Sequence, residues 1–103
     1  MAMYAIMVAQ LKLRLRTDFE DGSFTQMVIW QVPQPVPPSE HLYKYSLAYI
    51  VDGQRMLGYD NERGKGDHRH IGKIEEPVAF VSIEDLLRRF LAEVEAIRNG
   101  GQP

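Results

Sequence analysis

Apolar and polar residues alternate along the first half of the chain, and this period of two constrains the fold more than any other feature. In residues 11–16, leucines alternate with cations: Leu11, Lys12, Leu13, Arg14, Leu15 and Arg16. Successive side chains of a strand point to opposite faces, so this pattern predicts a half-buried strand. Residues 24–32 are rich in apolar side chains and predict a second strand. The intervening Asp21-Gly22 predicts a turn, so the two strands form a hairpin.

A second hairpin follows a connection that prolines at positions 33, 35, 37 and 38 stiffen. Asp52-Gly53 favours a type I′ turn between strands at Tyr43–Val51 and residues 54–59. In a regular hairpin with this turn, Tyr45 would face Asp60. One face of the third strand then carries an apolar and aromatic row: Tyr43, Tyr45, Leu47, Tyr49 and Val51. Such a row is typical of core packing, and stacking against a nucleobase is the alternative.

The C-terminal region predicts an amphipathic helix. Ser82 is a good N-cap, and Asn99-Gly100-Gly101 is typical of a helix end. Apolar residues recur at helical spacing between them: Ile83, Leu86, Leu87, Phe90, Leu91, Val94 and Ile97. Residues 77–81 are expected to form a short closing strand. The predicted fold is therefore α+β, an antiparallel sheet of four to five strands with the C-terminal helix packed on one face, in a single domain over residues 1–103.

Composition excludes several classes of function. The 103 residues contain no cysteine, which excludes disulfides, thiolate catalysis and cysteine-based zinc sites. The net charge of −2 argues against binding nucleic acid through bulk charge, although a local basic surface can still contact phosphates. Residues 1–10 are apolar but lack a basic start and are too short to span a membrane. We interpret them as a terminal strand or a short helix.

Polar chemistry is concentrated in residues 58–73, which we interpret as a loop. If His68-Arg69-His70 is extended, both imidazoles lie on one side and Arg69 on the other. Two histidines can act as base and acid in RNA cleavage through the 2′-hydroxyl. The cations available for the phosphate are Arg63, Lys65 and Arg69. Asp60 or Asp67 would orient an imidazole.

Other interpretations of this segment stay open. Asp67, His68 and His70 could ligate a divalent metal, with Asp60 completing the site. Gly64-Lys65-Gly66 could bind phosphate without catalysing a reaction. A P-loop is rejected because its full pattern, Gly-x4-Gly-Lys-Ser/Thr, is absent: Asp67 follows Gly66. The segment could also be a solvated loop. His41, outside the segment, is interpreted as a surface residue.

Residues 59–70 resemble the signature of the TumE-like toxin family. Three further stretches match: Asp21-Gly22-Ser23 leading into Met27-Val28-Ile29-Trp30, then Tyr43-Lys44-Tyr45, and Phe80-Val81-Ser82 before the helix. The resemblance covers about residues 11–98. It implies a cytoplasmic toxin of a type II toxin–antitoxin pair, neutralised by direct contact with a helix-turn-helix antitoxin. It does not specify the target, although many toxins of this size cleave RNA.

The leading hypothesis is a toxin that acts as a ribonuclease without a metal ion or cofactor. Its catalytic residues are His68 and His70 for proton transfer, Arg69 for phosphate and Asp60 for orientation. Substrate-binding residues are Tyr59, Asn61, Arg63 and Lys65. The alternative is a non-enzymatic module that binds a protein or nucleic acid. A homodimer through an exposed edge strand remains open.

Overall fold

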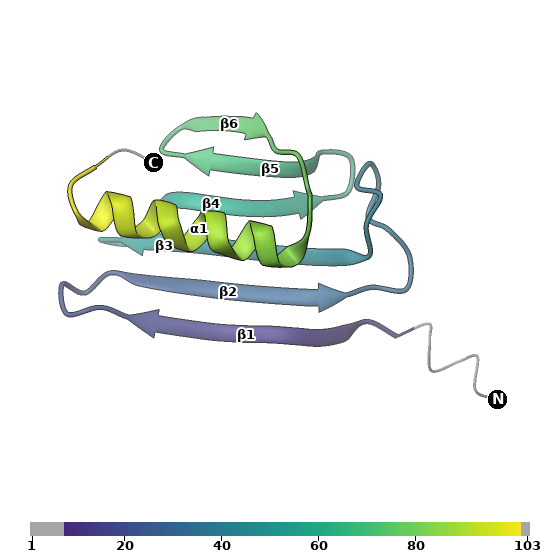
Figure 1. Ribbon diagram of the computed structural model, residues 1–103, viewed down its shortest axis with the longest axis horizontal. Coiled ribbons are helices and arrows are strands. Elements are labelled where there is room, and N and C mark those ends of the chain that lie inside the picture. Colours follow the sequence, from purple (N-terminus) through teal and green to yellow (C-terminus); the bar gives the residue numbers. More distant parts are fainter. Residues whose placement is uncertain (1–7, 102–103) are drawn as a thin grey trace.

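Residues 8–101 form one six-stranded antiparallel sheet with a single helix across it (Figure 1). The structure is a computed structural model that describes residues 8–101. The strands lie side by side in chain order, β1 to β6. Their bounds are β1 Gln10–Asp18, β2 Phe24–Gln31, β3 Tyr43–Val51, β4 Gln54–Glu62, β5 Gly66–Ile71 and β6 Ile74–Pro77, and the helix α1 spans Ile83–Arg98. The predicted α+β class and both predicted hairpins are confirmed.

The predicted strand number of four to five is wrong, because the polar segment is a hairpin and not a loop. β4 continues through Asn61 to Glu62, and β5 returns along it. Gly64 and Gly66 have φ angles of 87° and 76°, which glycine adopts without steric cost and which allow the tight turn between the strands. The closing strand lies earlier than predicted, at Ile74–Pro77. Of the segment predicted at residues 1–10, residues 1–7 lie outside the described residues.

An irregularity in β4 decides which side chains share a face. Asp52 and Gly53 both have positive φ, as a type I′ turn requires, so the predicted turn is confirmed. The pairing then shifts, because Ile50 faces Arg55 while Tyr49 faces Leu57, and Met56 is left as the extra residue of a bulge. Asp60 therefore lies opposite Ser46 and not opposite Tyr45 as predicted. A shift of one residue moves every later side chain of the strand to the other face.

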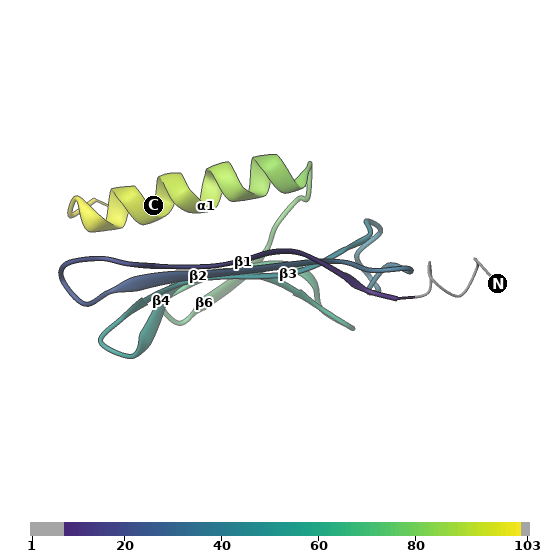
Figure 2. The same cartoon turned by 90° about the horizontal axis from the view of Figure 1, so that it is seen from below.

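The helix α1 packs over one face of the sheet, and Figure 2 shows these two layers. The core lies between them: Met27, Ile29, Tyr45, Leu47, Tyr49, Leu57, Tyr59, Leu86, Phe90 and Val94. The interpretation of the tyrosine row as core is confirmed, and stacking of Tyr45 or Tyr49 on a nucleobase is ruled out by their burial. The N-cap is confirmed, since Ser82 Oγ accepts from the Asp85 N–H at 3.0 Å. Leu91 departs from the predicted apolar face and is exposed.

The opposite face of the sheet carries no helix within the described residues (Figure 2). We call it the open face. It contains the side chains that alternate with the core residues, including Val28 and Trp30 on β2, Ser46 on β3 and Asp60 on β4. Among residues 8–101, no helix is long and apolar enough to cross a membrane.

Candidate functional site

The β4–β5 hairpin places both of its histidines on the open face. Asp60 pairs with His68 across the two strands, and Gly58 pairs with His70. Arg69 pairs with Tyr59, whose side chain is buried beneath α1. The alternation predicted for His68-Arg69-His70 is therefore confirmed: the two imidazoles share one face, and Arg69 lies on the other.

Hydrogen bonds assign a tautomer to each imidazole. Nδ1 of His68 lies 3.0 Å from the Gly66 carbonyl oxygen, which only accepts, so Nδ1 carries the proton and Nε2 of the neutral ring is a base. Nε2 of His70 lies 3.3 Å from the Asp60 carboxylate and donates to it, leaving Nδ1 for proton exchange. The side chains of His68 and His70 are 16% and 13% exposed, so each ring is mostly buried and only its edge meets solvent. Nε2 of His68 also lies 3.9 Å from the Glu75 carboxylate.

Arg55 is the cation that the fold brings to these histidines. Its Nη1 lies 3.7 Å from Asp60 Oδ2, so Asp60 lies between Arg55 and His70. Gly58 makes this possible: a Cβ at that position would lie 2.8 Å from the Arg55 Cδ. The aliphatic part of the Arg55 side chain occupies the space that a side chain at position 58 would need. No local sequence pattern points to Arg55, because its position depends on the bulge at Met56.

Arg69 makes its contacts on the helix side of the sheet. Its Nε donates to Glu93 of α1 at 2.9 Å, and its Nη1 donates to Glu76 at 2.9 Å. The hydrogen bond to Glu93 raises the pKa of Arg69 above its usual range, so the guanidinium stays charged. Tyr59 also donates its hydroxyl to Glu93. Burial, followed by this hydrogen bond, raises the pKa of Tyr59 to about 12. The sheet separates Arg69 from the imidazoles.

The remaining predicted residues divide into exposed and buried groups. Arg63 and Lys65 are exposed in the β4–β5 turn, and Lys65 Nζ lies 3.7 Å from Glu75. Asn61 is 0% exposed, accepts from the Tyr45 N–H at 3.0 Å and donates to the Tyr43 carbonyl at 2.7 Å. Tyr59 and Asn61 therefore have packing and hydrogen-bonding contacts where the sequence predicts substrate contacts.

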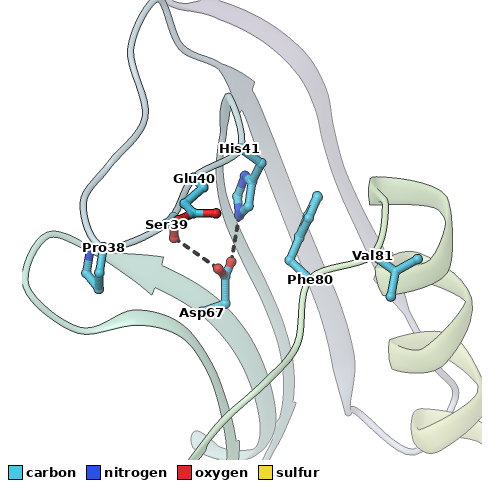
Figure 3. Close-up of a pocket in the computed structure, with 7 residues that line it drawn as sticks. All are labelled: Pro38, Ser39, Glu40, His41, Asp67, Phe80 and Val81. Carbon is cyan, nitrogen blue, oxygen red and sulfur yellow. Dashed lines mark hydrogen bonds and ion pairs between the residues drawn. The ribbon is translucent and has the colours of Figure 1, made fainter.

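A second polar cluster lies on the helix side, centred on Asp67 (Figure 3). Its carboxylate accepts from Ser39 Oγ at 3.0 Å, from the Tyr45 hydroxyl at 2.7 Å and from His41 Nε2 at 2.8 Å. Burial and the bond to Asp67 raise the pKa of Tyr45 well above that of a free phenol. His41 is not a surface residue as predicted: its side chain is 13% exposed and its ring stacks on Phe80.

This cluster holds a loop in place and lacks the geometry for nucleophilic catalysis. A cavity of about 490 Å³ lies beside it, lined by Pro38, Ser39, Glu40, His41, Asp67, Phe80 and Val81 (Figure 3). Ser39 bonds to Asp67 and not to His41. Nδ1 of His41 accepts from the Tyr43 N–H at 3.1 Å, so both ring nitrogens have partners. Without a serine–histidine bond, Ser39 is not activated as a nucleophile. The contacts instead fasten residues 39–41 to β5.

The metal site considered in the sequence is not assembled. Asp67 bonds to His41 on the helix side, whereas His68 and His70 lie on the open face, so these three side chains do not converge. In the part of the chain from residue 8 to 101, no group of three or more acidic or histidine side chains has the geometry of a metal site.

Comparison with known proteins identifies a family. The model of a family described as Toxin TumE matches residues 4–98, which is nearly the whole chain. No curated protein and no solved structure matches the chain.

Proposed function

Because this chain belongs to the TumE toxin family, we propose that it is the toxin of a toxin–antitoxin pair and that it cleaves RNA at the open face without a metal ion. One observation carries the ribonuclease proposal. His68 and His70 lie on the same partly exposed face, and each has one ring nitrogen fixed by a hydrogen-bonded neighbour. The other nitrogen of each ring makes no hydrogen bond within residues 8–101, although Nε2 of His68 lies 3.9 Å from the Glu75 carboxylate. Two residues along a strand span about 6.8 Å, which leaves room for a phosphate between the imidazoles.

The proposed reaction is cleavage by the neighbouring 2′-hydroxyl. Nε2 of His68 takes the hydroxyl proton, and the 2′-oxygen forms a bond to phosphorus. The bond from phosphorus to the 5′-oxygen breaks, and that oxygen takes a proton from Nδ1 of the His70 imidazolium. The products are a 2′,3′-cyclic phosphate and a 5′-hydroxyl, so no water or cofactor is consumed in this step. Asp60 holds His70 by accepting from its Nε2.

Arg55 takes the role that the sequence assigned to Arg69. The guanidinium lies on the same face as the histidines and is held near them by Asp60, so it can neutralise the charge that develops on the phosphorane. Arg63 and Lys65, exposed in the adjacent turn, contact neighbouring phosphates in this proposal. Tyr59 and Asn61 act indirectly, because they fix the strands beneath the site. Arg69 joins the sheet to α1 through Glu93.

The proposed partner is a helix-turn-helix antitoxin that neutralises the toxin by direct contact in the cytoplasm. Residues 1–103 act as a single domain in this scheme. Both statements rest on membership of a toxin family.

Induced expression with analysis of total RNA tests the proposal. We expect growth arrest with RNA fragments ending in cyclic phosphate for the wild type, and neither for His70→Ala. Arg55→Ala should slow cleavage by about 10²-fold, as expected for loss of one preorganised charge. Arg88→Ala is the matched control, because Arg88 lies on α1 with its side chain 75% exposed, away from the open face. Melting temperatures of all variants should agree within a few degrees.

Three outcomes would count against it. Unfolding of His70→Ala would make this histidine structural. Arrest with intact RNA would keep the toxin but favour a non-enzymatic binding module. RNA fragmentation that survives in His70→Ala would place the chemistry elsewhere.

A further inference from the structure

The open face continues from the histidines across the sheet to Trp30, the only tryptophan of the chain. Trp30 on β2 lies opposite Lys44 on β3. In the next row, Val28, Ser46, Asp60 and His68 face one another across β2 to β5. Three strand spacings of about 4.8 Å place Trp30 about 14 Å across the sheet from β5. In the row of Val28, the two residues before His68 are Ser46 and Asp60, which both have short side chains.

The surface near Trp30 is hollowed. A depression of about 150 Å³ is lined by Val28, Trp30, Lys44, Tyr45 and Ser46. Trp30 is only partly buried, although a tryptophan in a sheet usually packs against a second layer. Lys44 Nζ donates to the Asn61 carbonyl at 2.5 Å. That partner is neutral, so the ammonium charge beside the indole is not cancelled.

The charge of this half of the face is positive. On β1 to β3, the open face carries Arg14, Arg16 and Lys44 and one acidic residue, Asp18. Asp18 is paired with Arg16 at 3.0 Å, and within residues 8–101 Arg14 has no ion pair. Arg14 is opposite Val28, in the row that leads to His68. The part of the open face on β1 to β3, which contains Trp30, therefore has an excess of cations. The part on β4 and β5 contains the histidines that would transfer protons.

We infer that the open face binds single-stranded RNA, with a base stacked on Trp30 and phosphates contacting Lys44 and Arg14, and that it leads the strand to His68 and His70. This rests on the proposed function. Phosphates complement the cations, and an indole on an open sheet offers a platform for any unstacked base. A duplex keeps its bases stacked on one another, so it cannot use the indole. The inference therefore assigns single strands, and not duplexes, as the substrate class.

Trp30 is also the reporter for the test. We expect its fluorescence to be quenched when a single-stranded 2′-O-methyl RNA of about ten nucleotides binds the wild-type chain, which cannot cleave that probe. By fluorescence anisotropy of a labelled probe, Trp30→Ala should weaken binding about tenfold, and Trp30→Phe should restore most of it. Arg14→Gln should weaken binding and lower the salt dependence by about one phosphate contact. Arg88→Ala should bind like the wild type, and a duplex of the same sequence should bind more weakly.

The outcomes separate this inference from the proposed function. Binding with these effects, by a wild type that cleaves no RNA, would support the inference and contradict the ribonuclease. If the wild type cleaved RNA but Trp30→Ala bound the single-stranded probe with the same affinity as the wild type, the inference would be overturned and the proposed function would stand. A dimer that Trp30→Ala dissociates would assign the face to a second copy of the chain and also overturn it. Equal affinity for single strands and duplex would contradict the stacking role of Trp30.

Discussion

At the scale of single residues, position along β5 decides which chemistry a side chain meets. His68 and His70 point to the open face, where each ring is partly exposed. Asp67 and Arg69 point to the helix side, where each binds partners far away in the sequence. Neighbouring residues of one polar segment thus separate into a candidate active site and structural contacts, because side chains of a strand alternate.

Asp67 should contribute more to stability than any exposed acid of the same hairpin. We expect Asp67→Ala to lower the free energy of unfolding by about 3 kcal/mol, because it leaves donors of Ser39, His41 and Tyr45 without an acceptor. Asp67→Asn should cost less, since its amide oxygen still accepts. Urea unfolding followed by circular dichroism measures both.

Glu62→Ala is the control for Asp67→Ala, because Glu62 is exposed at the end of β4 and should change stability by less than about 0.5 kcal/mol. If Asp67→Ala unfolded at the same urea concentration as Glu62→Ala, the Asp67 cluster would have no structural role.

At the scale of elements, the side chain of Ser82 caps the N-terminus of α1. Ser82 Oγ accepts from the Asp85 N–H, which would otherwise lack a partner in the first turn. We expect Ser82→Ala to lower the free energy of unfolding by about 1 kcal/mol and Ser82→Gly by only a few tenths, because glycine is itself tolerated at an N-cap. Thermal unfolding of the two variants compares them directly. Equal losses in both would mean that the hydroxyl does not cap the helix.

At the scale of the whole molecule, the contact between the sheet and α1, in which Tyr59 donates to Glu93, should stabilise the fold less at high pH. Burial raises the pKa of Tyr59 to about 12 in the folded chain, whereas an unperturbed tyrosine has a pKa of about 10. Between these values the unfolded chain has lost the phenol proton while the folded chain keeps it, so the free energy of unfolding falls as pH rises. The stabilisation is complete below about pH 10 and lost as pH rises through about 12, and it amounts to about 2.7 kcal/mol in all.

The melting temperature measured from pH 8 to 12 tests this dependence. We expect a shallower alkaline decline in Tyr59→Phe, which has no phenol proton to lose, although its stability at pH 8 will be lower without the bond to Glu93. Tyr45, whose pKa is also raised, contributes to the decline in both proteins. Parallel curves for wild type and Tyr59→Phe would show that Tyr59 does not titrate in this way.

The sequence by itself determined the local structure. Alternation predicted the strands, Asp52-Gly53 predicted the turn, and the spacing of apolar residues after Ser82 predicted the helix. It also predicted that His68 and His70 would share a face, since that follows from extended backbone alone. Each of these properties depends on residues close together in the chain.

Only the tertiary structure decided which side chains meet. The bulge at Met56 moved Asp60 to the face of the histidines and left Arg55 within reach of it. The packing of α1 on one face buried Tyr59 and left the other face open, and contacts with β3 and Ser39 accompany the burial of Asn61. His41 bonds to Asp67, 26 residues away. Such contacts depend on register and layer packing, which arise from long-range pairing, so no local pattern specifies them.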